Sequence, residues 1–282
     1  MLGAALSIVE GPEATKVSEA PLMVRRVLVS LRSFWTDASP VDRVACCVGA
    51  LLLASGLAHL ALLIATGGSW QGPRSLRKAT TFGLSFGLTL ITIVWVASFI
   101  RLGRAARAVL LGVFMVACVL EIALISTQAW RGVPSHFNVE TPFDAAVTWL
   151  LAGGGVTLVL VILTLTIAAC RSNPRVPVSL AIAVRTGLLT LCGSLTIGAL
   201  VIAKGMTLAR GGAPEAAYAM GGALKPTHGA LMHGVLLLPL FAWLLTFTDW
   251  SERRRLVAVS IASCVYVGIA AAVAAGNLAG MY

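Results

Sequence analysis

Ionisable side chains fall inside apolar stretches at only a few points of this sequence, and these residues have the types that can do chemistry. His59, Glu121 and His233 each lie within a long run of apolar residues. A titratable group in such surroundings is costly to bury and by default indicates a functional site. Imidazole nitrogens bind metal ions and haem iron, and a carboxyl group in apolar surroundings can take up and release a proton.

These three residues are expected at one depth. A helix rises 1.5 Å per residue, so His59 and Glu121 each lie about 10 Å from the outer ends of their helices, and His233 about 8 Å. We therefore predict that the three side chains face one internal cavity. Further polar residues are expected near the outer mouth of that cavity: Lys78, Gln128, Arg131, His136, Asp144 and His228.

The elements that must position these residues are membrane-spanning helices. The chain has 282 residues, of which 58% are hydrophobic and 11% are charged, and its mean hydropathy is +0.92. A soluble domain carries about 25% charged residues. Beta-barrel alternation is absent, and runs long enough to span a bilayer predict an all-α, polytopic bundle of seven transmembrane helices. The predicted spans are about 44–66, 79–100, 106–129, 144–169, 178–203, 228–247 and 256–277.

The distribution of basic residues predicts the orientation of the bundle. With the N-terminus inside, thirteen Lys and Arg residues face the cytoplasm and seven face outward. This bias favours an N-in, C-out arrangement. Residues 1–40 form a cytoplasmic leader, in which 21–35 has the pattern of a basic amphipathic surface helix or of a partly disordered segment. Residues 41–282 form the membrane domain.

Several classes of function are excluded or disfavoured by the same patterns. The net charge of +10 is spread over short loops, with no basic tract that would indicate nucleic-acid binding. The six cysteines lie within or at the ends of apolar segments and are expected to behave as small hydrophobic residues. Seven spans do not divide into two equal halves, and no internal repeat is evident.

Local signals predict two structural features. Gly83 and Gly87, four residues apart, are expected to let a neighbouring helix approach closely. In the polar segment RGVPSHFNVETP, Thr141 is expected to cap the next helix with Pro142 at its first position. That segment is either an ordered connector or a lid over the His/Glu layer.

Three stretches of the sequence carry a family resemblance: SWQGPRSLRK from Ser69, RGVPSHFN from Arg131 and HGALMHGVLLLP from His228. Together they resemble an uncharacterised family of bacterial multipass membrane proteins, to which no activity is attached. The resemblance covers roughly residues 56–245. It implies a location in the bacterial inner membrane and implies nothing about chemistry.

Three functions fit the layer of ionisable residues. The first is a b-type haem site of a redox protein, with His59 and His233 as axial ligands and Glu121 beside the cofactor. The second is a proton-coupled carrier or a lipid-binding protein, in which Glu121 exchanges protons and the bilayer, an anionic lipid or a quinone is the partner. The third is an intramembrane zinc hydrolase using His59 and His233. A protein without any cofactor is equally compatible with these residues.

The N-in, C-out orientation can be tested with reporter fusions after residues 103 and 137 and at residue 282. We expect a cytoplasmic signal from the first fusion and periplasmic signals from the other two, because the positive-inside bias fixes the loop positions. A cytoplasmic signal at residue 137 would contradict both the orientation and the placement of the ionisable layer in the outer half.

Overall fold

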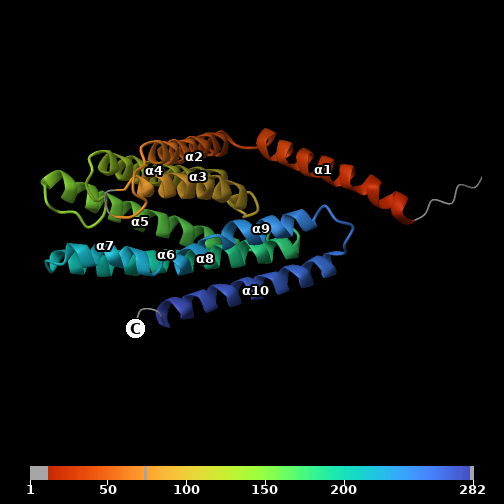
Figure 1. Cartoon of the computed structure of the whole chain (residues 1–282). Coiled ribbons are helices and arrows are strands. Elements are labelled where there is room, and N and C mark those ends of the chain that lie inside the picture. Colours follow the sequence, from red (N-terminus) through yellow and green to blue (C-terminus); the bar gives the residue numbers. More distant parts are fainter. Residues whose placement is uncertain (1–11, 73–74, 280–282) are drawn as a thin grey trace, which may run out of the picture.

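The computed structural model describes residues 12–72 and 75–279, which form ten helices in these ranges and no strand (Figure 1). Seven spans are long and apolar enough to cross a membrane. Six of them are single helices, namely α2 (Pro40–Ala65), α3 (Arg77–Ala97), α4 (Arg104–Trp130), α5 (Pro142–Ala169), α6 (Val178–Arg210) and α10 (Glu252–Ala279). The remaining span is made of α8 (Lys225–Met232) and α9 (Gly234–Leu245), which are separated at His233. The seven predicted spans of an all-α membrane protein are thereby confirmed.

Two of the described helices, α1 (Pro12–Thr36) and α7 (Pro214–Ala223), are not among the helices that are long and apolar enough to cross a membrane. Helix α1 extends away from the bundle before α2 begins (Figure 1), and α7 is a short helix between α6 and α8. Helix α1 includes the predicted segment 21–35, and Leu28 and Trp35 are exposed on it. Its placement on a membrane surface stays a prediction. Residues 1–11 of the predicted leader lie outside the described residues.

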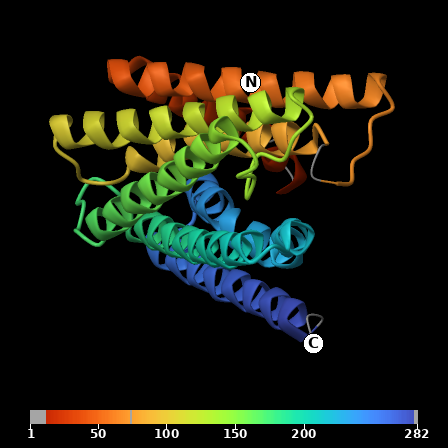
Figure 2. The ribbon, with the colours of Figure 1, turned by 90° about the vertical axis from the view of Figure 1, so that its left-hand side faces the viewer.

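The spans form two layers that α5 joins. Helices α2, α3 and α4 lie together on one side of the molecule, and α6, α8, α9 and α10 lie together on the other (Figure 2). Helix α5 crosses between them and packs on α4 in one layer and on α6 in the other. We call the two ends of the bundle the Asp42 end, which holds the α3–α4, α5–α6 and α9–α10 connections, and the Asp144 end, which holds the α4–α5 connection.

The closest helix pair is α2 with α3, and glycines make this approach possible. A Cβ atom on Gly83 would lie 2.7 Å from the Cα atom of Gly56, and a Cβ on Gly87 would lie 2.6 Å from the carbonyl oxygen of Gly49. The backbones of α2 and α3 are therefore in direct contact at two positions along the pair of helices, Gly56/Gly83 and Gly49/Gly87. The expected close packing at Gly83 and Gly87 is confirmed, and it holds α3 against α2 so that the other face of α3 meets α4 and α9.

The apolar core lies between the two layers and along α5. Its fully buried large side chains include Leu90 and Ile93 on α3, Leu111 on α4, Ile162 and Leu165 on α5 and Leu188 on α6. Many other large apolar side chains are exposed around the bundle, such as Ile64 on α2 and Val116 on α4. An exposed apolar belt of this kind is stable where lipid tails, and not water, surround it.

Replacing Gly83 with Ala tests the glycine contact. The added methyl group has no room against the backbone of Gly56, so we expect a loss of about 1–3 kcal/mol in stability, read as a lower unfolding temperature in detergent micelles. Gly153→Ala is the matched control, because a Cβ at Gly153 meets nothing within 4 Å. Equal unfolding temperatures for the two variants would contradict the proposed role of Gly83.

Candidate functional site

Glu121 lies on the buried face of α4, in the middle of the helix. Its side chain points at Gly154 on α5, where a Cβ atom would lie 2.5 Å from its Oε1 atom. Only 4% of Glu121 is exposed. The absence of a side chain at Gly154 leaves the space that the carboxyl group occupies, so the pairing of a glycine with an acid across two helices builds this site.

The Oε1 atom of Glu121 is buried and has no hydrogen-bond partner. Two other acids are buried as deeply in the part of the chain that the structure describes, Asp42 at 4% and Asp144 at 2% exposure. Both of those carboxylates accept hydrogen bonds and pair with an arginine. An ionised carboxylate without partners is expensive in a dry interior, so this site accepts the protonated, neutral form of Glu121 far more readily than the charged form.

Asp144 on α5 is hydrogen-bonded to Gln128, which lies two helical turns beyond Glu121 on α4, in a network at the Asp144 end. Its Oδ1 accepts hydrogen bonds from Gln128 Nε2 at 2.8 Å and from Arg131 Nη1 at 2.5 Å. Its Oδ2 accepts from Thr141 Oγ1 at 2.6 Å, and Thr141 in turn accepts from the Asp144 amide. The predicted cap by Thr141 is confirmed, and both carboxylate oxygens of Asp144 accept hydrogen bonds within this network.

The connection between α4 and α5 folds back against the bundle. The ring of Phe137 packs against Gly205 on α6, and Phe137 adopts a positive φ of 63° to reach it. The hydroxyl of Thr148 on α5 donates to the carbonyl oxygen of Asn138 at 2.7 Å. A small cavity of about 10 Å³ beneath this segment is lined in part by Phe137, Thr148 and Met206 and has room for about one water molecule. The segment is therefore an ordered plug over α5 and α6.

His136 is held within this plug as a neutral side chain. Its ring lies 5.9 Å from the ring of Phe82 on α3, and its Nδ1 is 2.9 Å from the Ser135 hydroxyl. Burial first, and then the positive charge of Lys78, lowers the pKa of His136 from 6.5 to about 3. Of the residues predicted at the outer mouth, Lys78 and His136 lie near each other, and Gln128, Arg131 and Asp144 form the second group.

The structure does not gather His59, Glu121 and His233 around one cavity. His59 lies on α2, where its Nδ1 is 2.8 Å from the Ser55 carbonyl oxygen and its Nε2 accepts a hydrogen bond from Trp130 on α4. His233 is exposed at the break between α8 and α9, with its Nδ1 facing the Gly229 carbonyl. Haem held between the two imidazoles stays a prediction, which these separate contacts do not favour.

The remaining histidine and the cysteines form no metal site in the described ranges. His228 is tied to α6, because its Nδ1 lies 2.9 Å from the carbonyl oxygen of Ser194. Residues 12–72 and 75–279 hold no group of three or more His, Cys, Asp or Glu side chains that could bind a metal ion. A zinc site made by His59 and His233 likewise stays a prediction.

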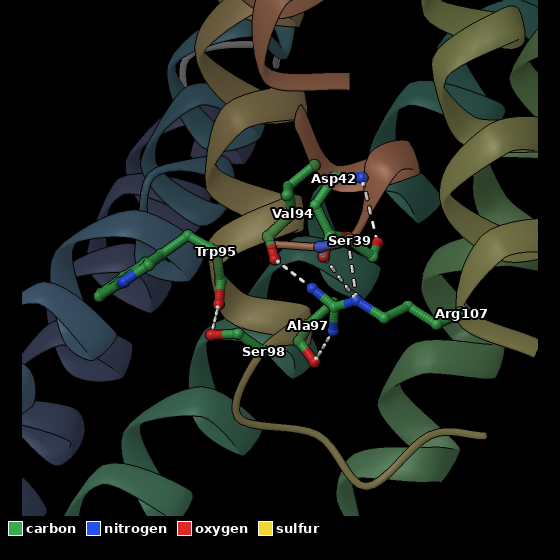
Figure 3. A network of polar contacts seen from close by, with 7 residues as sticks. All are labelled: Ser39, Asp42, Val94, Trp95, Ala97, Ser98 and Arg107. Atoms are coloured by element: carbon green, nitrogen blue, oxygen red, sulfur yellow. Dashed lines mark hydrogen bonds and ion pairs between the residues drawn. The ribbon is translucent and has the colours of Figure 1, made fainter. Parts of the chain in front are cut away.

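A buried ion pair at the Asp42 end was not anticipated from the sequence. Asp42, in the first turn of α2, accepts hydrogen bonds from Arg107 Nε at 2.9 and 3.2 Å (Figure 3). Arg107 also donates to the carbonyl oxygens of Ala97 and Val94 at the end of α3. Asp42 itself belongs to a capping box with Ser39. The signal that could have revealed it is the motif Ser39-Pro40-Val41-Asp42, which places an acid in the first turn of a span.

Comparisons of the chain with protein-family models, with curated proteins and with solved structures gave no match. The structural observations therefore define the class of protein, which is an integral, multipass helical membrane protein.

The neutral state of His136 predicts how the plug responds to acid. Because the folded-state pKa is below the usual value, the contribution of His136 to stability is complete above about pH 6.5 and is lost as the pH falls from 6.5 toward 3. We expect backbone amides of residues 131–141 to exchange hydrogen faster over that range, after correction for the intrinsic pH dependence of exchange. His136→Phe keeps an aromatic ring without a titrating group and should flatten the corrected profile. Matching acid profiles in the two proteins would contradict this account.

Proposed function

We propose that the protein is a proton-coupled membrane carrier in which Glu121 binds the transported proton. The observation that carries the proposal is the buried Oε1 atom of Glu121, which has no hydrogen-bond partner. Ionisable groups at such positions in transporters form proton relays, because each protonation changes the charge of a site that water and counter-ions do not reach.

The different treatment of the three buried acids supports this role. Asp42 and Asp144 are stabilised as carboxylates by arginines, and each joins two helices. Glu121 makes no polar contact with another helix, and its carboxyl group occupies the space beside Gly154 that a larger side chain would fill. A structural acid would be satisfied by its neighbours, whereas a proton-binding acid must be stable when neutral and must become hydrated or paired in a second conformation.

Glu121→Gln is the informative variant. Gln keeps the shape of the side chain and cannot titrate, so we expect the protein to fold normally and to lose proton uptake. Infrared difference spectra recorded across a pH titration should show a protonated carboxyl C=O band in the wild type that is absent from the variant. In liposomes with an imposed pH gradient and an internal pH dye, proton entry should fall about ten-fold or more, since proton exchange at a positioned group contributes 10²–10⁴-fold in rate.

The control for this experiment is Glu140→Gln, which removes an exposed acid from the α4–α5 connection. It should leave both the carboxyl band and proton entry as in the wild type. A wild-type spectrum without a protonated carboxyl band, or equal proton entry in the wild type and Glu121→Gln, would overturn the proposed function.

A further inference from the structure

Helices α3 and α4 have counterparts in the second layer at a constant separation along the chain. Helix α3 runs from Arg77 to Ala97, and the broken span α8–α9 runs from Lys225 to Leu245, so both of its limits lie 148 residues later. Helix α4 begins at Arg104 and α10 begins at Glu252, again 148 residues later. Two consecutive spans thus begin at the same spacing in both layers, and the first span of each pair has 21 residues.

The same separation relates a short motif at the end of each span. Trp95, Ser98 and Phe99 of the first layer correspond to Trp243, Thr246 and Phe247 of the second. In each case the tryptophan and phenylalanine rings meet edge to face, at 5.1 Å and 83° in the first layer and at 4.9 Å and 90° in the second. In each case the hydroxyl donates to the tryptophan carbonyl at 2.6 Å.

An arginine follows each motif and makes the same type of contact. Arg107 on α4 donates to carbonyl oxygens at the end of α3, and Arg255 on α10 donates to the Thr248 carbonyl just after α9. These two arginines are also 148 residues apart. An identical separation for two helix starts, two aromatic pairs, two hydroxyls and two arginines indicates a repeated unit, which corrects the expectation from the sequence that no internal repeat is present.

The third span of each unit is the one that comes before α3 or before α8–α9 in the chain, which is α2 or α6. Helix α2 packs on α3 through Gly49 and Gly87, and α6 packs on α9 through Gly187, where a Cβ atom would lie 2.8 Å from the Gly234 carbonyl oxygen. The units are therefore α2–α3–α4 and α6–(α8–α9)–α10, with α5 as the connector (Figure 2). One connecting span between units of three spans gives both units the same direction across the membrane, which relates them by a pseudo-two-fold axis along the membrane normal.

Trp95 and Trp243 locate this axis near the Asp42 end. The two equivalent residues contact each other, with ring centroids 5.9 Å apart at 86°. Contact between equivalent residues of two units takes place where the axis passes between them. The same correspondence relates the first residues of the equivalent spans at the other end, Arg77 of α3 and Lys225 of α8.

Three cations act electrostatically on one another near that end. The charges of Arg77 and Lys225 both act on the ammonium group of Lys78, and that of Arg77 acts on Lys225. No acid forms an ion pair with any of the three in residues 12–72 and 75–279. The Nε atom of Arg77 is buried without a hydrogen-bond partner. The first turns of α3 and α8 are partly capped, because the Arg77 amide donates to the Ser75 hydroxyl at 3.0 Å and the Thr227 amide donates to Asn277 Oδ1 at 3.1 Å.

We propose that an anionic group of the phosphate or carboxylate type binds on the pseudo-two-fold axis between the two three-helix units, held by Arg77, Lys78 and Lys225. A bound anion relieves the repulsion among these cations and supplies the missing acceptor for Arg77 Nε. Transport of that anion together with the proton of Glu121 rests on the proposed function, whereas binding of the anion does not.

The experiment measures anion binding to the purified full chain by two routes. Calorimetric titration with inorganic phosphate in a neutral detergent tests a free anion, and native mass spectrometry from nanodiscs with and without phosphatidylglycerol tests a lipid headgroup. We expect binding by at least one route. Arg77→Gln and Lys225→Gln should each weaken it about ten-fold and by similar factors, because the two residues are equivalent in the units, and about ten-fold corresponds to one lost charge-assisted contact.

The matched control is Lys204→Gln, which removes one exposed positive charge from α6. Its affinity should stay within about two-fold of the wild type. Equal weakening in the control and the two test variants would show general charge attraction and would overturn the proposal, as would a wild type that binds neither probe. Glu121→Gln should bind the anion with unchanged affinity, so loss of proton entry with retained anion binding separates failure of the proposed function from failure of this site.

Discussion

The structure depends on one constraint: the last carbonyl groups of a membrane helix have no partner within the helix and cannot be left bare in a dry environment. In this protein an arginine on the next helix supplies the donors. Arg107 serves α3, Arg185 donates to Ala169 at the end of α5, and Arg255 serves the end of α9. Each arginine couples the end of one helix to the flank of the next. All three arginines lie toward the Asp42 end, so hydrogen bonds from arginine to backbone carbonyls hold neighbouring helices together at this end.

The buried acids divide according to this arrangement. Asp42 neutralises Arg107, and Asp144 neutralises Arg131 at the opposite end of the bundle. Removal of either arginine would leave a buried unpaired charge, which is one of the costliest defects in a protein interior. Glu121 stands between the two ends without such a partner. Burial without a partner favours the neutral form of this carboxyl group. In the proposed function, the group is neutral in one conformation and charged in another, and this difference couples proton binding to a structural change.

The proposed structural change could take place between the two layers of helices. Between the layers, the equivalent residues Trp95 and Trp243 touch at the Asp42 end, and toward the Asp144 end the charge of Arg77 acts on Lys225. Small rotations of one three-helix unit against the other would keep the aromatic contact and change the spacing of the cations. Glu121 faces α5, the connector that packs on both layers, so the proposed change in its charge would act on the element through which the units are joined.

The sequence by itself determined the number and type of the elements, because seven runs of about 20 apolar residues leave the backbone no alternative to helices in lipid. It also determined local features that depend on neighbours in the chain, such as the Thr141 cap and the glycine spacing at Gly83 and Gly87. Only the tertiary structure decided which ionisable groups meet. Equal depth did not give His59 and His233 a shared hydrogen-bond partner, because depth fixes a position along the helix and not the direction in which a side chain points. The Asp42–Arg107 pair became visible only once helices far apart in the chain lay side by side. The residues separated by 148 positions are present in the sequence, but only their matching contacts in the structure mark them as equivalent.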